Sequence, residues 1–237
     1  MPKVKPQMNC FTCEGRGKSV FCNLNDEGVK LLNDSKNANI YKKGQNLFIE
    51  GNPPFGLYCL HSGKVKITKT NAEGRETIVR LAGSGDILGH RSLFSDSPYT
   101  ASATVIEDST VCFVSKKVIL AMIQTDPALA FEIMNKISLQ MGAAEERLAS
   151  LAQKSQRERF AELLLLLKES YGVEEKGGVR LDIKLTREEM ASMIGAASEN
   201  LIRLVSEFKK EALLEQVGKT LYIKDVQAIE KKANLGY

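Results

Sequence analysis

Hydrophobic and polar positions follow two different spacings along the chain, and the change of spacing divides it into parts. Between residues 40 and 114, hydrophobic residues fall in short runs that are separated by glycine-containing turns. The runs at 46–49, 57–60, 64–68, 77–81, 101–105 and 110–114 are predicted to be strands. Short strands at this turn-punctuated spacing indicate an all-β barrel or jelly roll.

Helical spacing precedes and follows these strands. Residues 25–36 are predicted to form a short helix in which Val29, Leu31 and Leu32 face inward, and the chain is predicted to be helical again from Lys116 onward. Between residues 126 and 155, hydrophobic residues recur at alternating steps of three and four. They are Met134, Ile137, Met141, Ala144, Leu148 and Leu151. This heptad spacing predicts a helix that pairs with its own copy, and the alternative is an ordinary helix that covers the β domain.

A second domain is predicted to begin near residue 155. Ser155 with Glu158 has the spacing of a capping box, and the hydrophobic core of this domain would start at Phe160. Residues 171–178 are predicted to be a polar loop, and 179–183 a strand. The expected division is a cysteine-containing segment at 1–23, a β domain at 24–125, a dimerisation helix at 126–154 and this second domain at 155–237.

Residues 185–208 have the pattern of a helix-turn-helix. Thr186 and Glu189 can form a capping box at the start of the first helix, and Gly195 lies in the turn. Ser198 is predicted to cap the second helix. The buried stripe of this helix is predicted to be Leu201, Leu204, Val205 and Phe208.

The opposite face of the second helix carries Glu199, Ile202 and Arg203. An arginine can bond guanine through two hydrogen bonds, and a glutamate can accept a hydrogen bond from cytosine N4. The pattern therefore favours a helix that reads DNA bases. The alternatives are a helical hairpin that serves only for core packing and a solvated ion pair between Glu199 and Arg203.

Residues 217–223 are predicted to form a β-hairpin wing behind this helix. Lys209, Lys210 and Lys219 lie near it and can contact phosphates. Overall charge is uninformative: the formal net charge is +4, and the residues from Ser155 onward contain 14 basic and 14 acidic side chains.

The composition excludes several classes of protein. With 43% hydrophobic and 26% charged residues, the 237-residue chain is expected to be soluble and globular. It has no hydrophobic run of membrane-spanning length and no apolar stretch typical of a signal peptide at its start, so the cytoplasm is the expected location. An enzyme is not expected, because the chain contains two histidines and neither a G-x-S-x-G motif nor a phosphate-binding loop.

Five cysteines form two groups in the sequence. Cys10 and Cys13 make a C-x2-C pair, and Cys22 follows after eight residues. Cys59 and Cys112 lie in predicted strands. Stable disulfides are disfavoured in a cytosolic protein.

The order of β domain, long helix and winged helix-turn-helix resembles the cyclic-AMP receptor and fumarate-nitrate-reduction regulator superfamily of bacterial transcription factors. The segments most similar to that superfamily are 43–51, 57–66, 85–89 and 198–203. The resemblance implies an α+β protein with an N-terminal β-roll of the cyclic-nucleotide-binding type. It also implies a homodimer that binds double-stranded DNA at a near-palindromic site, with one recognition helix in each major groove. RNA polymerase is a further partner that the resemblance allows.

The resemblance also implies roles for residues around the second helix. Glu199 and Arg203 would read the G·C pairs of each half-site, next to Ser198 at the start of the helix. Ile202 stands where relatives carry a small or hydroxyl residue, and it would contact a thymine methyl group. Arg187 and Lys184 would contact the phosphate backbone.

The signal that such a regulator would sense depends on the residues of the β domain. The cyclic-AMP branch uses a glutamate and an arginine-serine pair where this chain has His90 and Tyr99-Thr100. Without that arginine, standard cyclic-AMP binding is not expected. Another small effector remains an alternative, with His90, Thr100 and Ser102 lining its pocket, as does a regulator without an effector.

The oxygen-sensing branch holds a four-iron, four-sulfur (4Fe-4S) cluster through cysteines. The resemblance implies Cys10, Cys13, Cys22 and Cys112 as ligands, although the gap before Cys22 is longer than in that branch. Zinc or thiol redox chemistry is one alternative, and cysteines without a metal are another. An intact cluster would bias the 134–151 stripe toward the dimer that spaces the recognition helices.

Overall fold

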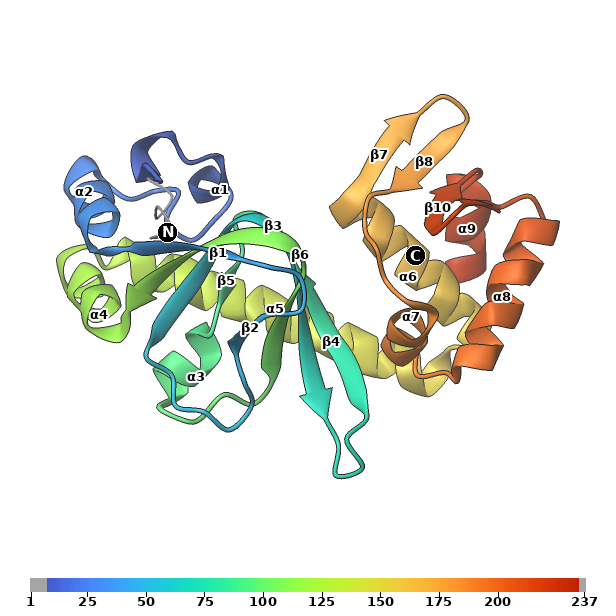
Figure 1. Ribbon diagram of the computed structural model, residues 1–237, viewed down its shortest axis with the longest axis horizontal. Helices are drawn as coiled ribbons and strands as arrows, with labels where there is room; N and C mark the ends of the chain where they lie inside the picture. Colours follow the sequence, from blue (N-terminus) through green and yellow to red (C-terminus); the bar gives the residue numbers. More distant parts are fainter. Residues whose placement is uncertain (1–7, 235–237) are drawn as a thin grey trace, which may run out of the picture. The chain divides into compact units, whose positions relative to one another are not determined.

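The computed structural model describes residues 8–234 and confirms an α+β protein. The chain forms two compact units, Met1–Gly142 and Ala143–Tyr237, so the boundary falls inside the long helix that the sequence places at 126–154. Each unit is described by itself. Figure 1 shows the β-rich first unit and the helical second unit with its small sheet. Within residues 8–234 no helix is long and apolar enough to cross a membrane.

A six-stranded antiparallel sheet makes up most of the first unit. Its strands are β1 (Asn37–Tyr41), β2 (Asn46–Phe48), β3 (Gly56–Thr70), β4 (Glu76–Ala82), β5 (Ile87–Leu88) and β6 (Ser102–Ser115). The order is β1-β6-β3-β4, with β2 paired to β6 and β5 paired to β3. The predicted β domain is therefore confirmed, and β3 and β6 form its centre.

Both central strands are longer than the sequence predicts. The predicted strands 57–60 and 64–68 join into β3, and 101–105 and 110–114 join into β6. Gly63, with a φ of 97°, accommodates a bulged stretch of β3 instead of ending the strand. Across this stretch the Lys64 Nζ lies 2.9 Å from a Glu107 carboxylate oxygen. Glu107, which the sequence places between two predicted strands, therefore forms a cross-strand ion pair with Lys64.

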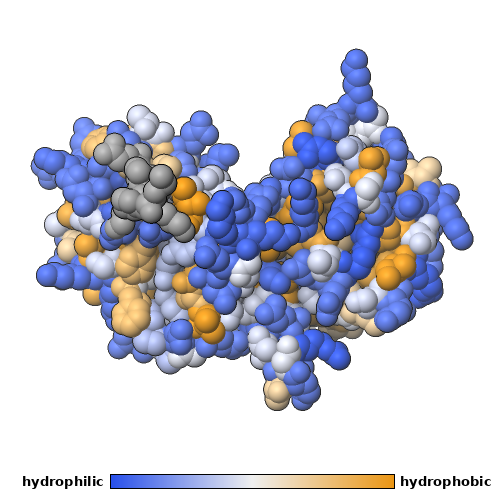
Figure 2. Space-filling model, viewed as in Figure 1, coloured by the Kyte–Doolittle hydropathy of each residue, from blue (hydrophilic) through white to orange (hydrophobic). Residues whose placement is uncertain are grey.

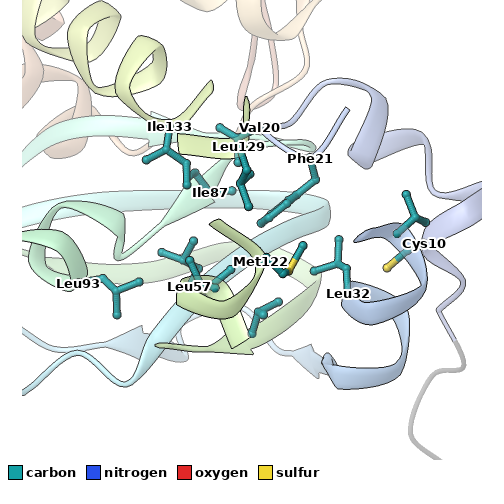
Figure 3. Close-up of a cluster of buried hydrophobic side chains, with 13 residues drawn as sticks. Cys10, Val20, Phe21, Leu32, Leu57, Ile87, Leu93, Met122, Leu129 and Ile133 are labelled. Carbon is teal, nitrogen blue, oxygen red and sulfur yellow. The ribbon is translucent and has the colours of Figure 1, made fainter. Parts of the chain in front are cut away.

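Alternate residues of the two central strands enter two separate cores. Leu60 and Val111 belong to a core on one face of the sheet. Leu57 and Val114 belong to a second core, which also contains Val20, Phe21, Leu129 and Ile133 from the segments that cover the other face. Figure 3 shows this second core, with Cys10 at one edge near Leu32.

Helices frame the second core. They are η1 (Cys10–Thr12), α1 (Glu14–Gly17), α2 (Asp26–Ser35), α3 (His90–Ser95) and α4 (Lys116–Thr125). In α2, Val29 and Leu32 are buried, as predicted, but Leu31 is exposed. One residue corresponds to about 100° of helix rotation, so Leu31 turns away when Leu32 faces the core.

The long helix α5 (Ala128–Gln153) buries Leu129 and Ile133 against the second core. Of the predicted dimer stripe, Ile137 is partly buried against that core and is therefore not fully available to a partner. The remaining stripe residues are exposed: Met134, Met141, Ala144, Leu148 and Leu151. Phe131, which the prediction omitted, is 69% exposed one turn before Met134.

The second unit is a helical domain with a four-stranded sheet. Its helices are α6 (Gln156–Tyr171), α7 (Arg187–Met193), α8 (Ser198–Lys210) and α9 (Val226–Ala233). Its strands are β7 (Gly172–Glu175), β8 (Gly178–Leu181), β9 (Leu214–Val217) and β10 (Thr220–Ile223), in the order β7-β8-β10-β9. The β9–β10 hairpin confirms the predicted wing. The predicted polar loop at 171–178 is wrong, because β7 is an exposed edge strand whose polar sequence hides its pairing with β8.

Candidate DNA-reading face and thiol cluster

The helix-turn-helix is fixed at its first helix by the predicted capping box. The Glu189 backbone N–H donates to Thr186 Oγ1 at 3.1 Å, and the Thr186 N–H donates to the Glu189 carboxylate at 2.8 Å. At the other end of α7, Arg159 Nε donates to the Ile194 carbonyl at 2.8 Å. Gly195 follows with a φ of 61°, a conformation that favours glycine, and so allows the sharp turn between the helices.

The second helix, α8, buries the predicted stripe and exposes the predicted reading face. Leu201, Leu204, Val205 and Phe208 are all buried. Glu199 is exposed, Ile202 is 52% exposed and the side chain of Arg203 is 66% exposed. These three side chains therefore lie on the outer face of α8.

The predicted cap of α8 is wrong. Ser198 is the first helical residue, and the N-cap is Ala197, which makes no side-chain cap hydrogen bond. The Ser198 hydroxyl therefore does not cap the start of α8, and the first backbone N–H groups of α8 keep their capacity to bind an anion.

Arg203 has a weak intramolecular partner. Its guanidinium lies 3.6 Å from a Glu207 carboxylate oxygen, whereas Arg157 donates to the same carboxylate at 2.8 Å. Within residues 8–234, no ion pair joins Glu199 to Arg203, so the solvated pair considered from the sequence does not form in this structure. Both side chains are left at the surface.

Basic residues surround this face unequally. Lys184, Lys209, Lys210 and Lys219 are exposed. Arg187, in contrast, is half-buried and donates to Gln216 Oε1 at 2.8 Å, and burial lowers its pKa. Arg187 therefore ties α7 to the wing. Figure 2 shows mostly hydrophilic side chains over the winged unit on the face in view, with separate hydrophobic patches.

Four of the five cysteines gather on one face of the central sheet. Cys59 on β3 and Cys112 on β6 are direct cross-strand partners. Residues that face each other in this way have their Cβ atoms about 5 Å apart on the same side of a sheet. That side is the one covered by the N-terminal segment, because Leu57 and Val114, two residues away on each strand, belong to the second core.

The N-terminal segment brings Cys10 and Cys13 to the same side. Cys10 belongs to the second core, and Cys59 packs against that core. The Cys13 Sγ lies 3.2 Å from Nδ1 of His61, two residues beyond Cys59 on β3. Gly15 approaches so closely that a Cβ there would lie 3.4 Å from the His61 carbonyl oxygen. The segment around Gly15 therefore packs in van der Waals contact with β3 at His61.

Arg16 closes the N-terminal segment into a loop. Its Nε donates to the Cys10 carbonyl at 2.8 Å, and its Nη1 lies 3.3 Å from the carbonyl oxygens of Phe21 and Cys22. The structure therefore holds the backbone of Cys22 near that of Cys10. Phe21 is 2% exposed, whereas the Cys22 side chain is only half-buried.

Burial keeps the inner cysteines protonated in the metal-free chain. It raises the pKa of Cys59 well above its usual value, with Cys112, Cys10 and Cys13 adding to the effect. Burial likewise raises the pKa of Cys112 to about 11 and the pKa of Cys10, the latter opposed by Lys36 and Arg16. A metal ligand must be a thiolate, so a bound metal would displace these protons.

Cysteine thiolates are suitable metal ligands, but these cysteine side chains do not surround a single ion. Within residues 8–234, no three Cys, His, Asp or Glu side chains converge tightly enough to hold a metal ion. A 4Fe-4S cluster is larger than one ion and its ligands lie further apart. Cys10, Cys13 and Cys112 of the expected set are brought together. Cys59 joins them, although a single sequence does not reveal which strand residues face each other.

The effector-pocket candidates are dispersed. His90 is 2% exposed, and its Nε2 lies 3.0 Å from Gln140 Oε1 on α5. Burial, together with the charge of Arg80, lowers the pKa of His90 to about 4. Ser102 Oγ instead accepts a hydrogen bond from the Glu50 N–H, and Thr100 is exposed. The structure therefore places only His90 in the interior.

Comparisons with known proteins agree with both units. Residues 39–126 match the profile of the cyclic nucleotide-binding domain, and residues 158–232 match that of the Crp-like helix-turn-helix domain. The chain is 27% identical over 214 residues to the CRP-like cAMP-activated global transcriptional regulator of Mycobacterium tuberculosis, which covers 90% of this chain and 96% of that protein. It is 28% identical over 192 residues to the anaerobic regulatory protein of Bacillus subtilis, covering 81% of each.

The fold has the same relatives. The structure of FixK2 from Bradyrhizobium japonicum superposes with a TM-score of 0.77 at 21% identity, over 85% of this chain and 99% of that chain. The two matched domains together span most of the sequence in the order that the structure shows. The chain therefore belongs to the CRP/FNR family of transcriptional regulators, with a β domain of the cyclic-nucleotide-binding type followed by a DNA-binding helix-turn-helix domain.

Proposed function

We propose that this regulator is a homodimer that recognises a specific, near-palindromic DNA sequence through α8. The observation that carries the proposal is the exposed outer face of α8, where Glu199, Ile202 and Arg203 lie opposite a fully buried stripe. Arg203 can donate two hydrogen bonds to guanine, and Glu199 can accept one from cytosine. Ile202 supplies an apolar contact for a thymine methyl group.

Positioning on the duplex falls to the basic residues around this face. Lys184, Lys209, Lys210 and Lys219 are exposed and can contact phosphates, which fix orientation without reading sequence. Of Arg187 and Lys184, the two residues expected to contact the phosphate backbone, Arg187 is the weaker candidate because its guanidinium already donates to Gln216.

The dimer would use the exposed stripe of α5. Met134, Met141 and Leu148 recur at seven-residue intervals and are 51%, 62% and 69% exposed. An apolar stripe at this repeat is the pairing surface of a coiled coil. Two copies paired in this way would present two α8 helices to successive major grooves.

The DNA-reading role is tested by single substitutions. Binding sites are first selected from a random duplex library, and Kd is then measured for the selected site and for half-site G·C replacements. Arg203→Ala and Glu199→Ala are each expected to lose about 1–3 kcal/mol of discrimination at their own base pair. Lys184→Ala, the matched control, is expected to weaken all duplexes alike and to reduce the salt slope by about one. Unchanged base preference in both the Arg203 and Glu199 variants contradicts the proposal.

The sensory part of the proposal is a 4Fe-4S cluster on the thiol cluster of the β domain. Its support is the gathering of Cys10, Cys13 and Cys112 on one face of the sheet, with Arg16 and Lys36 nearby to offset the negative charge of thiolates. Relatives include both an anaerobic regulatory protein and a cAMP-activated regulator. The polar groups that standard cyclic-AMP binding needs are replaced here by His90 and Tyr99-Thr100, which favours the first kind of signal.

A bound cluster would supply reactivity toward oxygen, and the chain would supply the connection to the dimer helix. Next to the cysteine segment, Asn23 Nδ2 donates to Glu132 Oε1 on α5 at 2.8 Å. Phe21 packs in the same core as Leu129 and Ile133 of that helix. The position of residues 10–22 is thus coupled to the first turns of α5.

Preparing the protein with and without oxygen tests this switch. Anaerobic protein is expected to contain iron and acid-labile sulfide, to absorb broadly in the visible range and to bind its site more tightly than air-exposed protein. Zinc without sulfide would support the tetrahedral-thiolate alternative. Equal DNA affinity in both preparations, with neither iron nor zinc, contradicts a metal-based switch.

A small effector is the second candidate, and one observation favours it. Within the described part of the chain, His90 Nδ1 and Gln140 Nε2 are buried polar atoms without a hydrogen-bond partner. A ligand that contacts both would satisfy them at the junction of α3 and α5. Metal-free protein whose DNA binding responds to a small-molecule fraction of the cell would support this candidate.

A further inference from the structure

We propose that Cys59, rather than Cys22, completes the metal-binding thiol set together with Cys10, Cys13 and Cys112. This inference rests on the proposed cluster and specifies its ligands. It departs from the set that the family resemblance implies, in which the C-x2-C pair and Cys22 are the N-terminal ligands.

The sheet supplies two of the four thiols as a fixed pair. Cys59 and Cys112 are register partners in the antiparallel pairing of β3 with β6, the most extensive pairing in the sheet. Both side chains lie on the face that the N-terminal segment covers. Two cysteines whose Cβ atoms lie about 5 Å apart on one face of a sheet can each bond a neighbouring iron atom of one cluster.

The N-terminal segment lays the other two thiols over this pair. Cys10 is 7% exposed and belongs to the core against which Cys59 packs. Cys13 contacts His61, which follows Cys59 on the same strand by two residues. The neighbours that act electrostatically on the Cys59 thiol are Cys112, Cys10 and Cys13. Each of the four cysteines therefore lies near the others.

Cys22 is held differently. Its carbonyl accepts from Arg16, and its N–H donates to the Ser19 carbonyl at 3.1 Å. In the same turn Phe21 takes the inward position, at 2% exposure, and Asn23 bonds α5. In this turn the side chain that points inward is that of Phe21 and not that of Cys22. Cys22 therefore stabilises the loop through its backbone hydrogen bonds.

The surroundings of Cys10 suit an anionic centre. Asn33 Oδ1 accepts hydrogen bonds from the Cys10 N–H at 3.0 Å and from Lys36 Nζ at 2.8 Å, and Arg16 donates to the Cys10 carbonyl. Each thiol would release its proton to solvent as its sulfur bonds iron, and these two cations would offset the charge left behind.

The test compares Cys59→Ala and Cys22→Ala in the full chain. Both variants and the unsubstituted protein are incubated anaerobically with equal amounts of ferrous and ferric iron and with sulfide, desalted, and assayed for iron, sulfide and visible absorbance. Cys22→Ala is expected to keep the iron content and spectrum of the unsubstituted protein. Cys59→Ala is expected to lose most of its iron and the broad absorbance, while circular dichroism shows a folded chain.

The outcomes separate this inference from the proposed function. Loss of the cluster in Cys22→Ala overturns the assignment of Cys59, whatever Cys59→Ala does, and so does retention of the cluster in Cys59→Ala. An unsubstituted protein that takes up no iron or sulfide overturns the cluster itself. Where Cys59→Ala does not fold, the loaded protein is treated with iodoacetamide. Alkylation at Cys22 with the absorbance intact supports the assignment, and bleaching in step with that alkylation overturns it.

Discussion

His90 is an uncharged side chain inside the β domain, and its environment makes stability depend on pH. Burial and Arg80 lower its pKa to about 4, below about 6.5 for an unfolded histidine. Between these two values the unfolded chain binds the extra proton, so stability is lost as the pH falls from about 6.5 toward 4. We expect a loss of about 2 kcal/mol between pH 7 and 5 in urea unfolding of the metal-free chain, followed by circular dichroism.

The two histidines of the chain provide the comparison for this prediction. His90→Gln keeps a group that can bond Gln140 and removes the titration, so its stability is expected to change less with pH over the same interval. His61→Gln removes the other histidine and is the control for the loss of one imidazole as such. Equal slopes in all three proteins would show that His90 does not carry the pH dependence.

Single residues show where a sequence pattern stops being informative. The outer face of α8 was predictable, because exposure of Glu199, Ile202 and Arg203 follows from helical periodicity alone. The hydrogen bond from Arg187 to Gln216 was not predictable, because it depends on the wing lying beside α7. The pairing of Cys59 with Cys112 likewise depends on strand register, which a single sequence does not fix.

At the scale of elements, the two helices of the helix-turn-helix differ in how their N-termini are capped. Thr186 accepts a hydrogen bond from Glu189 N–H, whereas Ser198 makes no capping bond. Thr186→Ala is expected to lower the unfolding free energy by about 1 kcal/mol, and Ser198→Ala to leave it nearly unchanged. Thermal unfolding of the two variants measures the difference. A larger loss in Ser198→Ala would contradict the arrangement at the start of α8.

Elements with strong periodicity were predicted better than those that depend on pairing. Both capping boxes and the wing agree with the sequence, since each depends on residues close together in the chain. The strands β3 and β6 were each divided in two, because a bulge and a cross-strand ion pair keep glycine and charged residues within a strand. The edge strand β7 was missed, because an exposed strand has no hydrophobic alternation to detect.

At the scale of the whole molecule, the proposed dimer can be tested with two leucines of α5. Leu148 belongs to the exposed stripe, and Leu139 is similarly exposed, at 65% against 69%. Nine residues, or roughly two and a half turns, place the two on opposite sides of the helix. Leu148→Glu is expected to shift the protein to monomer in sedimentation experiments, and Leu139→Glu to leave the dimer intact. The reverse result would move the pairing surface to the other side of α5.

The order of parts along the chain was the most predictable property of the whole molecule, because it rests on several independent local patterns. The boundary between the two compact units was less predictable from the sequence. The chain divides at residue 142, within a continuous helix, because Ser150 and Lys154 already bond Glu162 of α6. A helix can thus belong to two units without any break in its own periodicity.

The second core of the β domain has a consequence for anyone who wishes to remove the N-terminal cysteines. Val20 and Phe21 fill the same interior as Leu129 and Ile133, far along the sequence. Deleting residues 1–23 would expose the side chains of Leu129 and Ile133 to water and would favour aggregation. Replacing individual sulfur atoms is therefore the conservative route to a thiol-free protein, and a truncated chain that loses DNA binding would say little about the chemistry of its cysteines.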